Sequence, residues 1–367
     1  MKLVPQTSPY IRKNVSVARM MGDVIIALLP ITLFAMIHYK WGGIYVILIS
    51  LGVMLFSELF INMIIKWPKD MKIKELFTKD GFSKVKATYT INNFLAPIIS
   101  ALIFALIMPA NCSPYVVVCG AAFGIIVGKM LFGGLGQNIF NPAAAGRIFA
   151  TICFGKQIGS ANVSEVDAVL GATPLGEVAK NGMNSMIFDL KDLFLGNGIG
   201  GTLGEGCKLL ILIGAIYLFV RRSADLRSAL SYFLSFTVVI LIAAISYYAR
   251  YKTGNIAKMW AYQLLSGGVI FAAVFMITDP VTSPTTKFGR VAFGAIAGCM
   301  TAMIRTVGAY PEGAAFSILF ANMMAPALDY FMRGKPNTYT WKQCLGLGVG
   351  IVLVCCIVSA SVMGGWF

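Results

Sequence analysis

Residues 123–130 read Phe-Gly-Ile-Ile-Val-Gly-Lys-Met, and residues 293–300 read Phe-Gly-Ala-Ile-Ala-Gly-Cys-Met. Both fit the pattern F-G-x-I-x-G-x-M, and a Ser-Pro pair stands at the same offset before each, at 113–114 and 283–284. The match indicates an internal repeat. If five membrane spans separate the copies, they run in opposite directions, as in many transport folds whose binding sites lie at the repeat interface.

Close helix packing gives an alternative explanation of the match. Small residues let helices approach in a membrane, and glycines spaced by four occur in both copies. They are Gly120, Gly124 and Gly128 in the first and Gly294 and Gly298 in the second. The shared Phe, Ile, Met and Ser-Pro favour a true repeat.

The sequence around the repeat is strongly apolar. Of its 367 residues, 58% are hydrophobic and 12% charged, with a mean hydropathy of +0.79. Apolar runs approach the length of about 20 residues that crosses a bilayer. They are 20–39, 43–65, 91–109, 116–132, 139–154, 206–220, 229–248, 261–277, 291–304, 313–332 and 344–363. We predict an all-α integral membrane protein with about ten transmembrane helices; the runs allow ten or eleven.

The longest polar interruption divides the chain into three parts. These are an N-terminal membrane repeat (1–154), a loop (155–205) and a C-terminal membrane repeat (206–367). The net charge of +15 fits cytoplasmic loops rich in Lys and Arg, and we expect no nucleic-acid partner.

Basic loops predict the orientation in the membrane. Residues 66–86, 221–227 and 333–342 are rich in Lys and Arg and share one side if the N-terminus is cytoplasmic. The basic loop 250–258 does not follow this pattern. The assignment places the 155–205 loop on the outer face of the cell membrane.

Each repeat copy leads into a break in the helical pattern. Residues 133–143 read Gly-Gly-Leu-Gly-Gln-Asn-Ile-Phe-Asn-Pro-Ala, and residues 308–313 read Gly-Ala-Tyr-Pro-Glu-Gly. Glycine and proline here unwind the helix and expose backbone donors and acceptors. Such a break can bind a polar ligand or form a tight turn.

Acidic residues within apolar runs are costly and often functional. Glu58 and Asp329 are candidates for an ion path, whereas Asp23 lies at a span entrance, where an interfacial role explains it.

Residues 167–174 read Asp-Ala-Val-Leu-Gly-Ala-Thr-Pro, within the outer loop. Gly171 and Ala172 leave space beside Thr173, and Pro174 favours extended geometry at Thr173. The exposed hydroxyl can carry a phosphate ester. Taken alone, Gly-Ala-Thr-Pro is more typical of an ordinary turn.

With the repeat and the Asn-Pro-Ala turn, this motif resembles a membrane redox family. The family includes the D subunit of the Rnf complex, an ion-translocating ferredoxin:NAD oxidoreductase, and the homologous B subunit of the Na⁺-pumping NADH:quinone reductase. The resemblance covers nearly the whole chain. It implies FMN joined through its phosphate to Thr173, with Asp167, Gly171 and Ala172 completing a motif like D-x-x-[ST]-G-A-T. Leu170 stands where Ser or Thr is usual.

The resemblance also implies fold and partners. It predicts ten spans in two inverted five-helix halves, similar to urea channels. Expected partners are the Rnf membrane subunits A and E, the soluble subunits B and C, the flavin-carrying G subunit, the lipid bilayer and a flavin transferase. The chain would belong to a redox-driven translocase in a bacterial or archaeal cell membrane, with no independent catalytic activity.

A second, non-covalent flavin is expected at the cytoplasmic side. Asn141 and Asp279 each precede a proline at the ends of the predicted fourth and eighth spans. In the resembling family, polar contacts of riboflavin map onto an Asn and an Asp in what look like these turns. The alternative is that Asn141 and Asp279 only cap helix ends.

Three functions remain open from the sequence. The first is a flavin-carrying subunit that passes electrons across the membrane and couples them to Na⁺ or H⁺ transport. The second is a channel or carrier for a small polar solute on the same inverted repeat, and the third is a scaffold subunit without a cofactor. The Thr173 motif distinguishes the first, since a channel does not require it.

Overall fold

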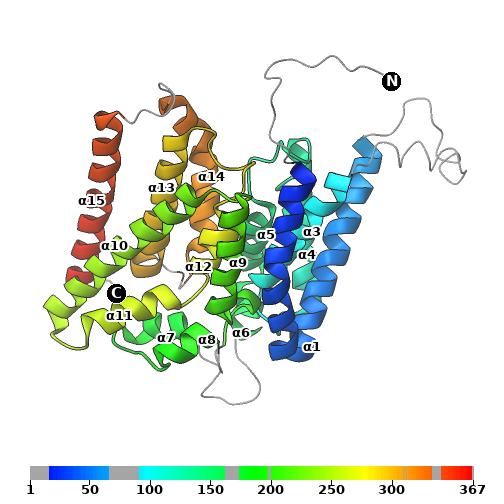
Figure 1. Ribbon diagram of the computed structural model, residues 1–367. Coiled ribbons are helices and arrows are strands. Elements are labelled where there is room, and N and C mark those ends of the chain that lie inside the picture. Colours follow the sequence, from blue (N-terminus) through cyan, green and yellow to red (C-terminus); the bar gives the residue numbers. More distant parts are fainter. Residues whose placement is uncertain are drawn as a thin grey trace, which may run out of the picture.

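The protein is seen here as a computed structural model that describes residues 16–65, 91–161, 173–196, 200–308, 310, 312–332 and 340–365. Every element in this part of the chain is helical and none is a β-strand (Figure 1), which confirms the all-α fold. The larger helices are α1 (Val17–Ile65), α3 (Ile91–Leu106), α4 (Pro114–Ile126), α5 (Pro142–Cys153), α9 (Lys208–Arg221), α10 (Leu226–Tyr251), α11 (Ile256–Leu265), α13 (Lys287–Val307), α14 (Ala314–Phe331) and α15 (Trp341–Gly364).

Shorter elements connect them. They are η2 (Met130–Phe132), α6 (Gly155–Ala161), α7 (Pro174–Asn181), α8 (Leu190–Leu195), η3 (Leu203–Glu205), α12 (Val269–Phe271) and the π-helical η4 (Ala272–Met276). The predicted polar loop thus contains short helices within its described residues. Figure 1 shows α7 and α8 at the end of the molecule opposite the start of α1.

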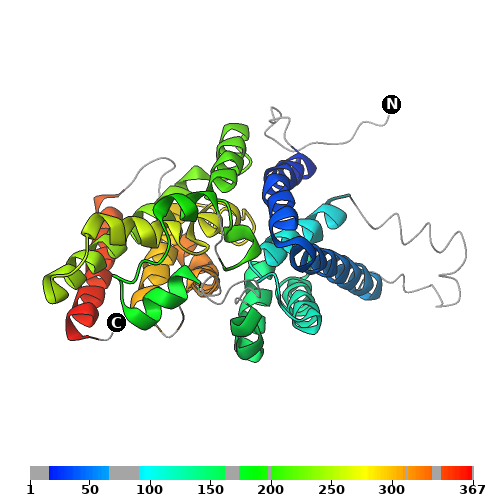
Figure 2. The same ribbon diagram turned by 90° about the horizontal axis from the view of Figure 1, so that it is seen from below.

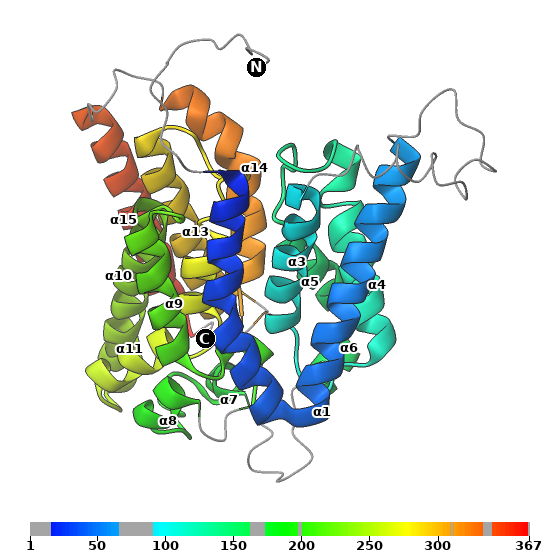
Figure 3. The ribbon, with the colours of Figure 1, turned by 45° about the vertical axis from the view of Figure 1, so that its right-hand side comes forward.

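Helix α1 joins the first two predicted apolar runs through a bend at Lys40, where φ is 49° and ψ is −129°. Close packing explains the two glycines that follow. A Cβ on Gly42 would lie 2.9 Å from the carbonyl oxygen of Ala110, and one on Gly43 would lie 2.8 Å from that of Ala35. Figure 3 shows the two halves of α1 diverging from this bend toward the same end of the molecule.

Six single helices in the described residues are long and apolar enough to cross a membrane: α1, α4 together with η2, α10, α13, α14 and α15. The α11 helix and the α12–η4 segment qualify as a pair but are bent by 57°. Helices α3, α5 and α9 are apolar but shorter than the roughly 20 residues of a full span. The chain is therefore a multi-pass membrane protein, and the count of ten or eleven spans stays a prediction.

The first matched stretch begins in the last turn of α4 and runs past its end, the second lies on α13, and these two helices run in opposite directions. Lys129, just past the end of α4, lines the same cavity as Val17 at the start of α1. Val281, shortly before α13, lines that cavity too. Helix α4 therefore ends at the same end of the molecule at which α13 begins. Figure 2 shows α1, α3 and α4 gathered on one side of the molecule and α10, α13 and α15 on the other.

The glycines of both copies also allow the close helix packing that the alternative explanation requires. A Cβ on Gly124 of α4 would lie 3.3 Å from the Cα of Gly146 on α5. A Cβ on Gly298 of α13 would lie 3.1 Å from the backbone nitrogen of Phe236 on α10. The two helices therefore run in opposite directions and also pack closely against their neighbours through these glycines. The glycines have this packing role whether or not the two stretches descend from a true repeat.

The predicted break after the first copy is present. Helix α4 ends at Ile126 and α5 begins at Pro142, and Gly133, Gly134 and Gly136 have φ values of 112°, 89° and 84°. Residues with side chains rarely adopt these values, so this break depends on glycine. It brings Asn141 to the start of α5.

Candidate functional site

A first cavity, with a volume of about 250 Å³, lies at the end that carries α7. Its walls come from α5, α7, the segment before α9, the bend between α11 and α12, and the start of α14. Lining residues with functional groups are Arg147, Thr151, Thr173, Thr202, Glu205, Tyr310 and Glu312. Both halves of the sequence contribute, so the cavity exists only in the assembled fold.

Thr173 lies at the edge of this cavity and caps α7. Its φ of −72° and ψ of 141° confirm the extended geometry that Pro174 predicts. The Oγ1 atom accepts a hydrogen bond from the backbone N–H of Gly176 at 3.0 Å. Thr173 therefore faces a space that can hold a ligand while it stabilises the first turn of α7. Asp167, Gly171 and Ala172 lie outside the described residues.

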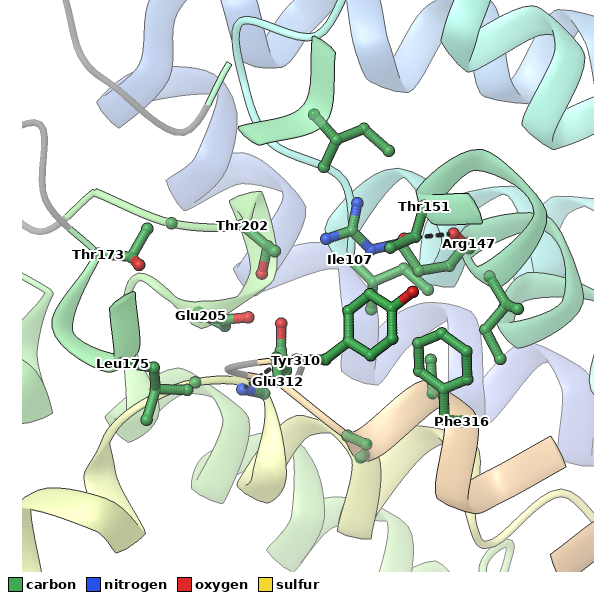
Figure 4. Close-up of a pocket in the computed structure, with 18 of the residues that line it drawn as sticks. Ile107, Arg147, Thr151, Thr173, Leu175, Thr202, Glu205, Tyr310, Glu312 and Phe316 are labelled. Carbon is green, nitrogen blue, oxygen red and sulfur yellow. Dashed lines mark hydrogen bonds between the residues drawn. The ribbon is translucent and has the colours of Figure 1, made fainter. Parts of the chain in front are cut away.

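Two glutamates face each other in the same cavity, and the sequence analysis did not single out either. Figure 4 shows the carboxyl groups of Glu205 and Glu312 pointing toward one another. Oε1 of Glu312 accepts a hydrogen bond from the N–H of Gly268 at 2.7 Å. Burial, together with the neighbouring Glu312 carboxylate, raises the pKa of Glu205 to about 8.

Two arginines, one half-buried and one buried, lie near the carboxyl pair. Arg147 of α5 lines the cavity, and its Nη1 lies 3.5 Å from the sulfur of Met108. Arg305 of α13 is 6% exposed, and its Nε and Nη2 atoms have no hydrogen-bond partner among the described residues. A Cβ on the cavity residue Gly267 would lie 2.8 Å from that Nη2. Unpaired buried donors of this kind favour an anionic group nearby.

Aromatic rings form another part of the wall. Tyr310 and Phe316 both line the cavity, with ring centroids 4.9 Å apart and an interplanar angle of 27° (Figure 4). Stacked rings offer a flat apolar face that suits a planar conjugated ligand.

A second cavity, of about 530 Å³, lies at the opposite end, beside the start of α1. Asn141 and Asp279 both line it, so the fold brings together the two residues that the sequence predicted to act jointly. Most of the remaining lining is apolar. The polar lining residues that the sequence analysis missed are Asn92, Ser100, Lys129, Asn138, Ser223 and Thr278.

Asn141 and Asp279 also have local structural roles, as the capping alternative requires. Oδ1 of Asn141 accepts from the N–H groups of Ala143 at 3.1 Å and Ala144 at 3.4 Å, which caps α5. Oδ1 of Asp279 accepts from the N–H of Val281 at 3.1 Å. Capping and ligand binding are compatible, since each side chain still borders the cavity.

Asn92 adds an observation that points to a ligand. Its Oδ1 atom is buried and has no hydrogen-bond partner within the described protein. An unpaired buried acceptor costs free energy, so a donor from a ligand or water in this cavity would stabilise it.

The ion-path candidates lie in different surroundings. Glu58 is 1% exposed and forms a buried ion pair with Lys129, with Nζ and Oε2 2.6 Å apart. Asp329 accepts hydrogen bonds from the backbone N–H groups of Thr285, at 2.9 and 3.0 Å, and of Thr286, at 3.1 Å. Asp329 therefore anchors the start of α13. Their role in ion transport stays a prediction.

Asp23, predicted to be interfacial, is buried and held by the second half of the chain. Its carboxylate accepts from Ser223 Oγ at 2.5 Å and from Tyr217 and forms an ion pair with Arg221 at 3.2 Å. This contact ties the start of α1 to the end of α9.

Two elements separate the cavities. Helix α5 borders the second cavity at Asn141 and the first at Arg147 and Thr151, and η4 borders the first at Ala272 and the second at Val274. A helix rises 1.5 Å per residue, so Asn141 and Thr151 lie about 15 Å apart along α5. Short π-helical turns such as η4 occur frequently at functional sites.

The chain is similar to D subunits of two ion-translocating oxidoreductase complexes over most of its length. The D subunit of the Na⁺-translocating ferredoxin:NAD⁺ oxidoreductase complex of Acetobacterium woodii is 32% identical over 339 residues, covering 91% of this chain and 95% of that protein. The D subunit of the proton-translocating complex of Clostridium ljungdahlii is 28% identical over 337 residues, covering 89% and 93%.

A second group of relatives is longer than this chain. The B subunit of the Na⁺-translocating NADH-quinone reductase of Chromohalobacter salexigens is 39% identical over 238 residues, which are 64% of this chain and 57% of that protein. The match to these reductase subunits thus spans less than two thirds of their length.

The profile of one family matches residues 4–338, which is most of the sequence. The matched region includes both cavities, Thr173, Asn141 and Asp279. The chain therefore belongs to the NQR2, RnfD, RnfE family.

Proposed function

We propose that this protein is the flavin-carrying membrane subunit of an ion-translocating ferredoxin:NAD oxidoreductase complex. It carries FMN on Thr173 and riboflavin in the second cavity, and electrons cross the membrane between them to drive Na⁺ or H⁺ transport. The chain acts as part of a redox-driven translocase in the cell membrane. Its partners are Rnf subunits A, E, G, B and C, with a flavin transferase for maturation.

One observation carries this proposal. The predicted acceptor Thr173 and the predicted pair Asn141 and Asp279 border two separate cavities at opposite ends of the molecule. A solute channel does not require an acceptor hydroxyl at one cavity and a separate pair of polar, ligand-binding side chains at the other. Transfer between two bound redox groups needs this arrangement.

The first cavity fits FMN. Thr173 offers its hydroxyl at the rim, and Arg147 and Arg305 supply positive charge for a phosphate or a reduced ring. Tyr310 and Phe316 offer a flat wall. A bound flavin supplies one-electron and two-electron chemistry, while these residues hold it and adjust its charge environment.

The second cavity fits a neutral flavin better than a phosphorylated one. Among its described lining residues the one cation is Lys129, which is already paired with Glu58. A phosphate there would be buried without a free cation, which is costly. Asn92, Asn141 and Asp279 can instead bind the polar edge or hydroxyl groups of riboflavin.

The experiment is chemical analysis of the purified chain. The full-length protein is produced together with a flavin transferase and, as a control, without it. Denatured protein from the first preparation should fluoresce in a gel and gain the mass of one FMN by intact-mass measurement, and the second should not. A chain of unmodified mass in both preparations would overturn the FMN assignment.

A further inference from the structure

The two glutamates of the first cavity lie close to one another. A Cβ on Gly268 would lie 2.7 Å from Oε1 of Glu312 and 3.4 Å from Oε1 of Glu205, and Figure 4 shows the two carboxyl groups pointing toward one another. Two ionised carboxylates side by side in a buried site repel each other, and this repulsion raises the proton affinity of the pair. We therefore expect one proton to be held between the two groups.

Nearby cations do not form ion pairs with the two glutamates in the described part of the chain. Charged or titratable groups approach the pair from Tyr39 on α1, Arg147 on α5, Lys208 on α9 and Arg305 on α13. None of these cations is within the 4.0 Å of an ion pair with Glu205 or Glu312, since the salt bridges in the described residues join other partners. Lys208 Nζ donates instead to the backbone carbonyl of Glu205.

Arg305 has donor groups that can still stabilise a negative charge near the carboxyl pair. Its Nε and Nη2 are buried and have no hydrogen-bond partner within the described part of the chain, and Nη2 lies beside Gly267, which lines the cavity. Together with Arg147 it gives the cavity an excess of positive charge that the singly ionised carboxyl pair does not cancel. An added negative charge would be stabilised here and would also raise the proton affinity of the carboxyl pair.

We infer that Glu205 and Glu312 form a proton-binding site whose occupancy is coupled to the charge held in the Thr173 cavity. The coupling to reduction rests on the proposed function, whereas the shared proton does not. Thr202 belongs to the same site, because it lines the cavity and its backbone carbonyl accepts a hydrogen bond from the N–H of Glu205 at 3.2 Å. Neither glutamate has a role as a flavin-attachment residue in this inference.

The coupled step balances in charge and atoms. One electron enters the cavity from a one-electron carrier of the complex, or from dithionite in the experiment, and one proton from water binds an ionised carboxylate of the pair. Oxidation removes the electron and releases that proton. No bond other than the carboxyl O–H forms or breaks, and the net charge of the cavity is unchanged.

The first test examines the shared proton without any flavin. Infrared difference spectra between about pH 7 and pH 9 are recorded on the full chain carrying Thr173→Asn, which keeps a capping side chain and removes the acceptor hydroxyl. We expect loss of a protonated-carboxyl band and gain of a carboxylate band. Adding Glu205→Gln, or Glu312→Gln in a second variant, should abolish the pair of bands, and Glu177→Gln should leave them.

Glu177 is a suitable control because it lies on α7 near Thr173 but pairs with Asn181 and does not line the cavity. A spectrum with no carboxyl change in the Thr173→Asn protein would overturn the inference, as would a change that persists in both glutamine variants.

The second test examines the coupling in flavin-loaded protein. The midpoint potential of the FMN on Thr173 is measured against pH for the wild-type chain and the Glu205→Gln and Glu177→Gln variants. A proton bound with each electron lowers the potential by about 59 mV per tenfold fall in proton concentration. We expect a steeper fall above about pH 8 in wild type and Glu177→Gln than in Glu205→Gln.

The two tests separate the inference from the proposed function. If no FMN is attached, the proposed function fails while the infrared measurement still decides whether the pair holds a proton. If FMN is attached but all three proteins show the same dependence on pH, the coupling is wrong and the proposed function stands.

Discussion

Asn141 donates a hydrogen bond from Nδ2 to the backbone carbonyl of Met276, 135 residues later in the chain, at 3.4 Å. Asn141 caps α5 in the first half, and Met276 ends the π-helical turn η4 in the second. The backbone N–H of Asn141 also lies 2.9 Å from the side chain of Asn322 on α14 when that amide is oriented to accept. The turn that precedes α5 is therefore fixed by the second half of the molecule.

This contact makes Asn141 testable in two separable roles. Asn141→Asp keeps an acceptor for capping α5 and loses the Nδ2 donor, whereas Asn141→Ala loses both. Loss of an N-cap costs about 1 kcal/mol. We expect Asn141→Ala to be less thermally stable than Asn141→Asp, and both variants to release less riboflavin on acid or solvent extraction than wild type.

Asp279→Ala should likewise lower the extracted riboflavin, while the FMN on Thr173 stays unchanged in all three variants. Chromatography of the extract gives the amount of riboflavin, and intact mass reports the FMN. Well-folded wild-type protein that releases no flavin would contradict the second site.

Thr173 offers a similar separation of roles. Thr173→Val keeps nearly the same shape but loses the cap to Gly176 as well as the acceptor hydroxyl. Thr173→Asn restores a capping oxygen without a hydroxyl, and Thr173→Ser keeps both. We expect covalent FMN in the Ser variant at a reduced level and none in the Val or Asn variants, with folding best preserved in Asn and Ser. Covalent FMN on the Val variant would disprove the assignment.

The buried pair Glu58 and Lys129 allows a double-mutant cycle. Removing one partner of a buried ion pair leaves an uncompensated charge and typically costs about 3–5 kcal/mol. We expect Lys129→Met and Glu58→Leu each to lower the unfolding midpoint strongly, and the double variant to recover most of the loss. Ion transport by reconstituted complex then reports separately on the ion-path prediction, because a stable double variant that transports normally would exclude a required charge at Glu58.

The orientation can be tested with single cysteines at exposed described positions. Lys180 is exposed on α7 near Thr173, and Arg227 is exposed at the start of α10, at the other end of the molecule. Each is replaced by cysteine in a separate variant. An impermeant thiol reagent should label Lys180→Cys and not Arg227→Cys in intact cells. The exposed native cysteines Cys119, Cys153, Cys344 and Cys356 must first be replaced or measured as background. The opposite labelling pattern would reverse the proposed electron route.

The raised pKa of Glu205 predicts how stability varies with pH. A glutamate titrates near pH 4.3 when unfolded, and Glu205 does so near 8 in the fold. Between these values the native state binds more protons than the unfolded state, so the free energy of unfolding falls as pH rises through this window. The thermal midpoint of wild type should drop more than that of Glu205→Gln between about pH 6 and pH 9. An equal drop in both would contradict the raised pKa.

The sequence by itself determined the features that depend on neighbours in the chain. Apolar runs near the length of a bilayer predicted the helices, and Gly133–Gly136 with Asn141-Pro142 predicted the break between α4 and α5. Pro174 predicted the extended geometry of Thr173, because a proline restricts the residue before it. These effects act over a few residues, so composition and order are sufficient to reveal them.

Only the tertiary structure decided which side chains share a cavity. Glu205 ends η3 and Glu312 lies before α14, more than a hundred residues later, and Lys129 pairs with Glu58 across 71 residues. In each case the contact depends on how helices rotate and slide against one another, which periodicity does not fix. The polar groups beside Thr173 were therefore invisible in the sequence, although the acceptor hydroxyl itself was not.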